Sequence, residues 1–82
     1  SYYYSGNLEL AVSDYSQTLV LNSTYINALF QRGLAYNKLK KHDLAIADYT
    51  RGLILAPNDS QFYYNRGIAY SDKNDLDLAM AD

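Results

Sequence analysis

Covalent or metal chemistry in a chain of this size would need histidine, cysteine or clustered acidic side chains. His42 is the only histidine, and the chain has no cysteine. We take this to exclude Ser–His–Asp and Cys–His catalysis and a Cys/His zinc site. Asp72, Asp75 and Asp77 are crowded together, but they lack the spacing and the closing glutamate of an EF-hand loop. We therefore expect no enzyme activity, no metal and no cofactor, and a packing role for His42.

Arginine and aspartate recur at intervals that favour ion pairs. Four pairs are separated by 16 or 18 residues: Arg32–Asp48, Arg66–Asp82, Asp14–Arg32 and Asp48–Arg66. In antiparallel helix hairpins with short turns, residues at such intervals lie at about the same height. We therefore predict a ladder of partly buried Arg–Asp pairs, which would satisfy each guanidinium and fix the register between helices. The alternative is that these residues are solvated surface charges.

Composition and charge narrow the remaining classes of protein. The 82 residues suffice for one small domain, and the net charge is −2 with both signs scattered along the chain. That balance disfavours a nucleic-acid footprint and a basic membrane-binding patch. No apolar run is long enough to span a membrane, and no segment resembles a signal peptide. Nothing identifies the compartment directly, and the cytoplasm is the one we expect.

One short motif occurs twice at a fixed interval. RGLAY at residues 32–36 returns as RGIAY at residues 66–70, which is 34 residues later. The same shift aligns Asp43, Leu44 and Ala45 with Asp77, Leu78 and Ala79, and aligns Tyr2, Ala11, Asp14 and Tyr15 with Tyr36, Ala45, Asp48 and Tyr49. No insertion interrupts the interval. The chain is therefore expected to consist of 34-residue repeats.

Two amphipathic helices fit within each period. Apolar residues at helical spacing predict helices over residues 8–21, 25–39, 42–55, 59–72 and from 75 onward. Turns between paired helices are expected at Gly6-Asn7, Lys40-Lys41 and Lys73-Asn74. Pro57 should separate the units, because proline cannot continue a helix. Lys40 is less suited to a left-handed turn than the glycine or asparagine of the other turns.

Small residues occupy the middle of several predicted helices. Gly33 and Gly67 lie where glycine costs about 1 kcal/mol relative to alanine. Such a cost is tolerated where a neighbouring helix must approach closely, and Ala45 and Ala79 are interpreted in the same way. We expect both glycines to face an adjoining helix, with the tyrosine three residues later filling the space beside the contact.

These residues resemble the tetratricopeptide repeat, whose pattern is aromatic-x2-Leu-Gly-x2-Tyr, then Ala-x3-aromatic, then a proline before the next unit. The middle unit matches with Gly33, Tyr36, Ala45, Tyr49 and Pro57, and the last unit with Tyr63, Gly67, Tyr70 and Ala79. Departures are Arg32 and Arg66 for leucine, Leu29 for the aromatic, and Thr18 and Gly52 for a late alanine. The resemblance divides the chain into a partial repeat (1–25), a complete repeat (26–59) and a partial repeat (60–82).

The resemblance implies an all-α fold: an α-α superhelix, or solenoid, of antiparallel helix hairpins with a 34-residue repeat. The first helix of each unit would line a concave groove. Its residues by register are Tyr3, Tyr4, Asn27, Phe30, Gln31, Leu34, Asn37, Lys38, Gln61, Tyr64, Asn65, Ile68, Ser71 and Asp72. Phe30, Leu34, Tyr64 and Ile68 lie off the core stripe and have no obvious intramolecular partner, so a partner segment could cover them. Alternatively, they pack against flanking helices of a longer superhelix.

The expected function is a non-enzymatic scaffold that docks a protein or peptide segment in this groove. The rival interpretation is a structural module that stacks head to tail and has no separate ligand. The chain opens inside the first helix of one unit and stops within the second helix of another, so we expect a slice of a longer array. Apolar faces at its two ends would then favour head-to-tail self-association.

Overall fold

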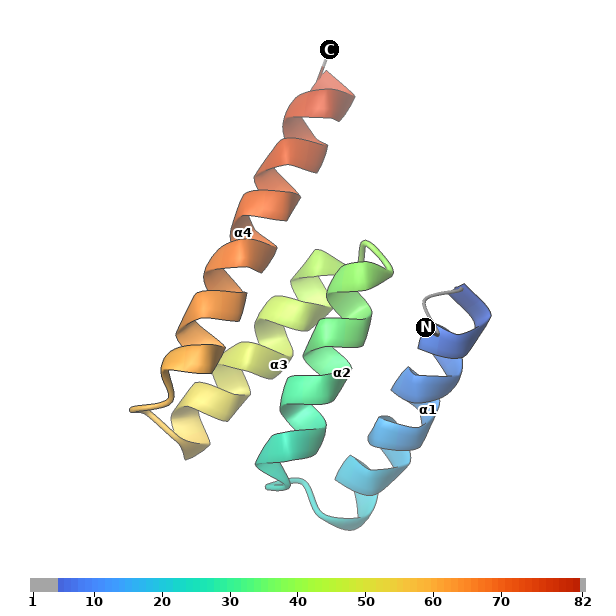
Figure 1. Ribbon diagram of the computed structural model, residues 1–82, viewed down its shortest axis with the longest axis vertical. Coiled ribbons are helices and arrows are strands. Elements are labelled where there is room, and N and C mark those ends of the chain that lie inside the picture. The colour runs from blue at the N-terminus through green and yellow to red at the C-terminus, as the bar shows by residue number, and fades with distance from the viewer. Residues whose placement is uncertain (1–4, 82) are drawn as a thin grey trace.

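The structure is a computed structural model that describes residues 5–81, with side chains described for residues 7–74. It contains four helices: α1 (Ser5–Leu21), α2 (Ile26–Lys38), α3 (His42–Leu55) and α4 (Ser60–Ala81) (Figure 1). No strand occurs among residues 5–81, which confirms the all-α prediction. Within the same range, no helix combines the length and the apolarity needed to cross a membrane.

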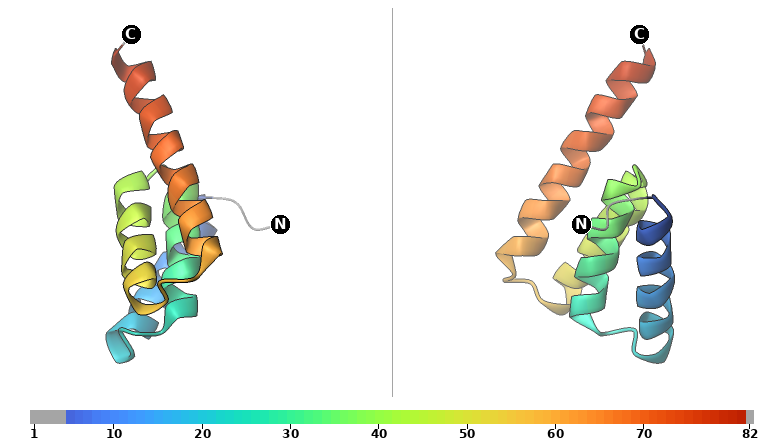
Figure 2. Two further views of the ribbon diagram at one scale, coloured as in Figure 1. Left: turned by 90° about the vertical axis from the view of Figure 1, so that its left-hand side faces the viewer. Right: turned by 45° about the vertical axis from the view of Figure 1, so that its right-hand side comes forward.

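Successive helices run antiparallel and pack in chain order. The α2–α3 hairpin is the centre of the molecule, and α1 and α4 lie on its two opposite sides (Figures 1 and 2). Among the described elements, α1 packs against α2 alone, whereas α4 packs against α3 and also touches α2. This arrangement leaves α1 and α4 each with one side that no described helix covers.

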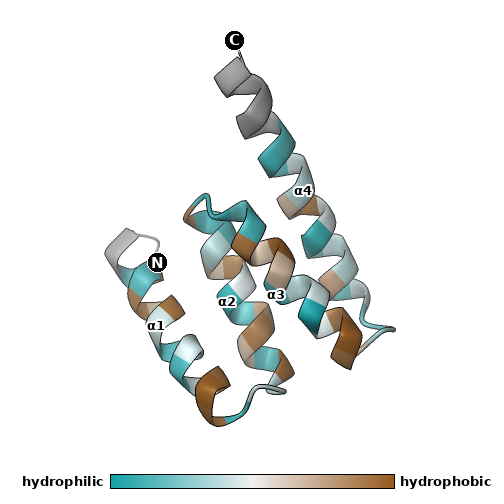
Figure 3. Cartoon of the chain, turned by 180° about the vertical axis from the view of Figure 1, so that it is seen from behind, coloured by the Kyte–Doolittle hydropathy of each residue, from teal (hydrophilic) through white to brown (hydrophobic). Residues whose placement is uncertain are grey.

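The core consists of two clusters that meet at the central hairpin. The larger lies mainly between α3 and α4 and contains Ala45, Tyr49, Leu53, Phe62 and Ala69, with Phe30 and Tyr36 of α2 packed against it. The smaller lies between α1 and α2 and contains Leu19, Ala28 and Leu29. The last turns of α1 and α3 are strongly apolar as well (Figure 3), but there Val20, Leu21 and Ile54 are exposed. Burial is therefore concentrated on α3, because this helix contributes residues to the larger cluster and its Leu55 packs against the smaller one.

The predicted turn at Lys73-Asn74 is wrong, because α4 continues through it as a single helix to Ala81. The segment holds no proline or glycine, so each further residue adds a backbone hydrogen bond. A turn is favoured only where the returning helix buries an apolar face, as α3 does with Ala45 and Tyr49. The predicted turn at Gly6-Asn7 is also absent, because α1 already begins at Ser5.

Polar contacts hold α4 against the end of α2 and the start of α3. Asn37 donates from Nδ2 to Asp72 Oδ2 at 3.0 Å, and its Oδ1 contacts Nδ1 of the buried His42. The Lys73 ammonium lies 2.7 Å from Asp43. These contacts connect the end of α2, the start of α3 and the middle of α4, so His42 belongs to a polar network rather than to an apolar cluster.

Lys40 makes the turn between α2 and α3, with φ at 66°. A left-handed backbone costs a residue with a Cβ roughly 1–2 kcal/mol, and glycine avoids this cost. We expect Lys40→Gly to raise the free energy of unfolding by about 1 kcal/mol in a urea titration. Lys41→Gly is the matched control, because Lys41 has φ at −97°. Equal effects of the two substitutions would contradict the assignment of strain to Lys40.

Candidate interaction site

Gly33 lies in a close contact between the two helices of the central hairpin. A Cβ placed on Gly33 would stand 2.5 Å from Cε1 of Tyr49, which is almost completely buried. The ring in the space thus comes from α3, while Tyr36 packs beside it against the same cluster. Gly52 has the same relation to the Phe62 ring of α4, where a Cβ would overlap the ring. In the repeat pattern Gly52 is only a departure from the late alanine, so the pattern gives no sign of this role.

Gly67 does not behave like Gly33, which corrects the expectation that both face an adjoining helix. A Cβ on Gly67 would have no heavy atom within 4 Å. Tyr70 is half exposed rather than filling a contact. The physical reason is the continuous α4: within residues 5–81, no helix folds back over this side.

Arg32 joins three of the helices through its guanidinium. Its Nε and Nη2 donate to the two carboxylate oxygens of Asp48 on α3 at 2.8 and 2.7 Å, and Nη1 donates to Ser16 Oγ on α1 at 3.1 Å. Asp48 is buried, and Cζ of Arg32 lies 5.5 Å from the centre of the Tyr36 ring. The hydrogen bonds that Arg32 donates to Asp48 raise the pKa of Arg32 above its ordinary value, so the pair stays charged.

The rest of the predicted ladder is not formed among the described side chains. Arg66 donates to the hydroxyl of Thr50 at 3.3 Å and lies over the Tyr63 ring, with no carboxylate near it. The Asp14 carboxylate is exposed and makes no hydrogen bond or ion pair. The 18-residue intervals fail because both oxygens of Asp48 already bind Arg32 and a hydroxyl takes the place of the second acid. Asp82 lies outside the described residues.

The predicted groove residues lie on one side of α2 and one side of α4. They recur at intervals of three and four residues, which places each set on a single helical face. Tyr64 is 72% exposed and Ile68 is 37% exposed, and Asn27, Gln61 and Ser71 are exposed as well. Asn65 is half-buried, and its Nδ2 donates to the Gln61 carbonyl at 2.8 Å. Tyr3 and Tyr4 lie outside the described residues.

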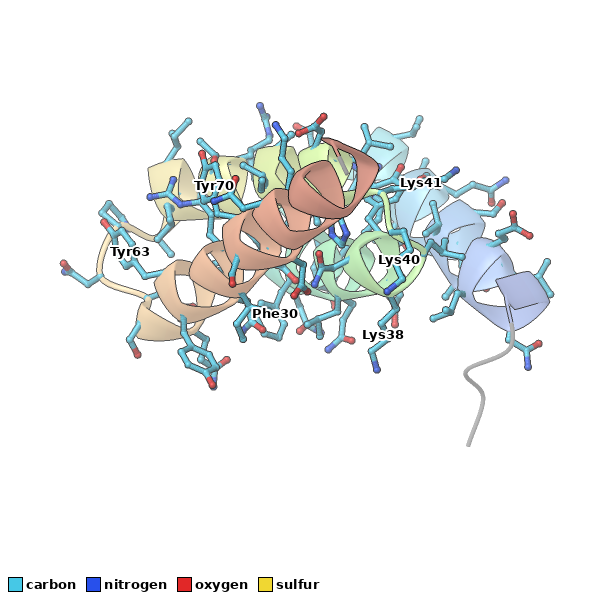
Figure 4. All side chains as sticks on the ribbon, turned by 90° about the horizontal axis from the view of Figure 1, so that it is seen from above. Phe30, Lys38, Lys40, Lys41, Tyr63 and Tyr70 are labelled. Carbon is cyan, nitrogen blue, oxygen red and sulfur yellow. The ribbon has the colours of Figure 1, made fainter. Side chains whose placement is uncertain are left out.

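Phe30 was expected to lack an intramolecular partner, and this is wrong. Its ring packs edge-on against Phe62 with centroids 5.3 Å apart, and lies 6.2 Å from the Tyr49 ring. Figure 4 shows Phe30 on one side of α4, with Tyr63 and Tyr70 on the other. Phe30 therefore packs against the core between α2 and α4. Its replacement would affect stability as well as any docking.

The α2 part of the predicted groove is divided between two environments. Gln31, Leu34 and Lys38 line a pocket of about 330 Å³ whose other wall is α1, with Leu8, Ala11 and Tyr15. Asn37 lies toward α4 instead and is held by Asp72. The exposed apolar part of the surface is thus the α4 part, around Tyr64 and Ile68.

The buried phenol of Tyr49 makes stability depend on alkaline pH. Burial and the neighbouring Asp48 raise the pKa of Tyr49 to about 12, from an ordinary value near 10. Above pH 10 the unfolded chain loses this proton before the folded chain does, so stability is lost as the pH rises toward 12. We expect Tyr49→Phe to make the stability of the chain fall less steeply over this window. Parallel pH profiles of the two proteins in urea titrations would contradict this.

Models of one repeat family match the whole described chain. Two models described as the tetratricopeptide repeat match residues 26–59 and 49–81, and a third, described as the TPR repeat, matches residues 1–40. No curated protein and no solved structure matches the sequence.

Proposed function

Because the chain belongs to the tetratricopeptide repeat family, whose repeats generally mediate protein–protein interaction or scaffolding, we propose that it docks a protein or peptide segment on the face shared by α2 and α4. That family is typically non-enzymatic, and the proposal assigns no reaction to this chain. The proposed partner is a protein or peptide, and neither nucleic acid nor a membrane is proposed. A location in the cytoplasm stays a prediction.

The observation that carries the proposal is the exposed apolar side of α4. Tyr64 and Ile68 are adjacent on one helical face, and neither belongs to the two core clusters. The exposed amide of Gln61 lies one turn before Tyr64 on α4, whereas Asn27 of α2 lines a pocket with Tyr15 and Thr18 of α1. An apolar side chain of a partner could cover Tyr64 and Ile68 while the Gln61 amide bonds its backbone. The chemistry fits a short segment with one or two apolar anchors.

A selection from a random-peptide display library tests this proposal. Peptides selected on the 82-residue chain are expected to bind Tyr64→Ala at least about tenfold more weakly, because aromatic anchors dominate such interfaces. Ile54→Ala is the matched control, since Ile54 is equally exposed but lies on α3. Helicity by circular dichroism should be unchanged in both variants. Equal binding to Tyr64→Ala and to the parent chain would contradict the docking face.

Phe30→Ala is unsuitable for this test because Phe30 is part of the core packing. Loss of binding in that variant would not separate docking from partial unfolding. Tyr64 and Ile68 avoid the difficulty, since the first is largely exposed and the second is exposed on the same side. An Ile68→Ala variant should weaken the same peptides by a smaller factor than Tyr64→Ala.

A further inference from the structure

One side of α4 repeats the surface of α2 without the helix that covers it. On α2, Gly33 and Tyr36 lie on the side that faces α3, whose Tyr49 ring fills the space at Gly33, and Leu29, one turn before Gly33, is buried in the smaller cluster. The α4 residues 34 positions later are Tyr63, Gly67 and Tyr70. Both tyrosines are about half exposed, and the space at Gly67 is empty. Figure 4 shows the two tyrosines on the side of α4 away from Phe30.

One side of α1 repeats the surface that α3 turns toward α2. On α3, Ala45, Asp48 and Tyr49 are buried in that contact. The α1 residues 34 positions earlier are Ala11, Asp14 and Tyr15. Ala11 and Tyr15, together with Leu8, form the α1 wall of the 330 Å³ pocket, and Tyr15 also packs partly against the smaller core cluster. The Asp14 carboxylate is exposed beside them and has no partner among the described residues.

We call the surface of α4 with Tyr63, Gly67 and Tyr70 and the surface of α1 with Ala11, Asp14 and Tyr15 the two open sides. Their charges are complementary in the same repeat register. Arg32 binds a hydroxyl of the preceding helix, Ser16, and a carboxylate of the following helix, Asp48. Among the described side chains, Arg66 has the equivalent hydroxyl, Thr50, but no carboxylate. The acid equivalent to Asp48 in the preceding unit is Asp14, which has no cation. Each open side thus carries the charge that the other one lacks.

We propose that copies of this chain associate end to end, with α1 of one copy packing on α4 of the next as α3 packs on α2. Tyr15 enters the space at Gly67, and Asp14 binds Arg66. The two sides cannot meet within one copy, because α1 and α4 lie on opposite sides of the central hairpin (Figure 1). Such a contact joins different surfaces, so it produces open chains or rings rather than a symmetric dimer. It uses another side of α4 than the docking face and does not rest on the proposed function.

Charge exchange tests the contact. Asp14→Arg places two arginines at each interface, and Arg66→Asp places two aspartates there. Each variant alone is expected to associate roughly 10- to 100-fold more weakly than the parent in sedimentation velocity. An equimolar mixture of the two should recover association, because every interface between unlike copies again pairs arginine with aspartate. Recovery on mixing cannot come from a folding defect in either variant.

Two controls separate this contact from other forms of association. Arg51→Glu reverses an exposed charge on α3 outside both open sides, and it should associate like the parent. Gly67→Ala adds a Cβ where the Tyr15 ring should lie, so it should weaken association although it favours the helix. A parent chain that stays monomeric over a roughly hundredfold concentration range would overturn the proposal. The proposal would also be overturned if the two charge variants associated like the parent, or if their mixture failed to recover association. In each case another occupant, such as the chain after Asn74 folded back, covers α4.

Discussion

Gly33→Ala is expected to lower the free energy of unfolding by about 2 kcal/mol, whereas Gly67→Ala is expected to raise it by about 1 kcal/mol. The two glycines occupy the same place in successive repeats, and both lie inside helices. Alanine is the better helix former at each site. At Gly33 its Cβ meets the Tyr49 ring at 2.5 Å, and that ring is too well buried to move aside cheaply. At Gly67 the Cβ meets nothing.

Urea unfolding followed by circular dichroism measures both effects, at a protein concentration low enough to exclude association. The opposite signs make the pair its own control, since a general effect of alanine on helix formation would stabilise both variants. A stabilised Gly33→Ala would show that the Tyr49 ring can be displaced without loss. A destabilised Gly67→Ala would show that this side of α4 is covered in solution.

Asp48→Ala is expected to lower the free energy of unfolding by about 2–3 kcal/mol. Its two carboxylate oxygens accept from Arg32 at 2.7 and 2.8 Å, and the aspartate is 5% exposed. Removing it leaves a guanidinium whose side chain is only 22% exposed and whose one other hydrogen bond is to Ser16. That partial exposure lets water replace some of the lost interaction, so we expect less than the 3–5 kcal/mol typical of a fully buried pair.

Asp14→Ala is the matched control, because Asp14 holds the same place one repeat earlier and its carboxylate has no partner in the structure. Its effect on stability should stay within about 0.5 kcal/mol. The comparison uses the same urea titrations. Equal losses for the two aspartates would mean that the pair with Arg32 contributes nothing beyond an ordinary surface charge.

The central hairpin could be predicted from the sequence because its signals are local and agree with one another. Residues 26–55 combine helical periodicity, a repeated motif and a turn, and the structure has α2 and α3 there. The α4 helix could not be predicted in the same way. Asn74 is a better turn residue than Lys40, yet only the turn at Lys40 forms. Whether a chain turns depends on what the returning helix would bury, and that is not a local property.

The side chains of the site show the same division. The 16-residue interval placed Arg32 opposite Asp48, because hairpin geometry determines height. The 18-residue intervals failed, because height alone does not say which acid has oxygens to spare. Phe30 was assigned to the surface from its place in the register. Its contact with Phe62 depends on how closely α4 approaches α3, because the Phe62 ring lies over the missing side chain of Gly52.

The two glycines whose side-chain space is filled by a ring, Gly33 and Gly52, give the row of helices a direction. In both contacts the glycine belongs to the earlier helix and the ring to the next one along the chain: Tyr49 at Gly33, and Phe62 at Gly52. The two ends are therefore not interchangeable, since the α4 end presents a hole at Gly67 and the α1 end presents a ring at Tyr15. A synthetic helix that caps the α4 end must bring an aromatic residue, while a cap for the α1 end must bring a glycine.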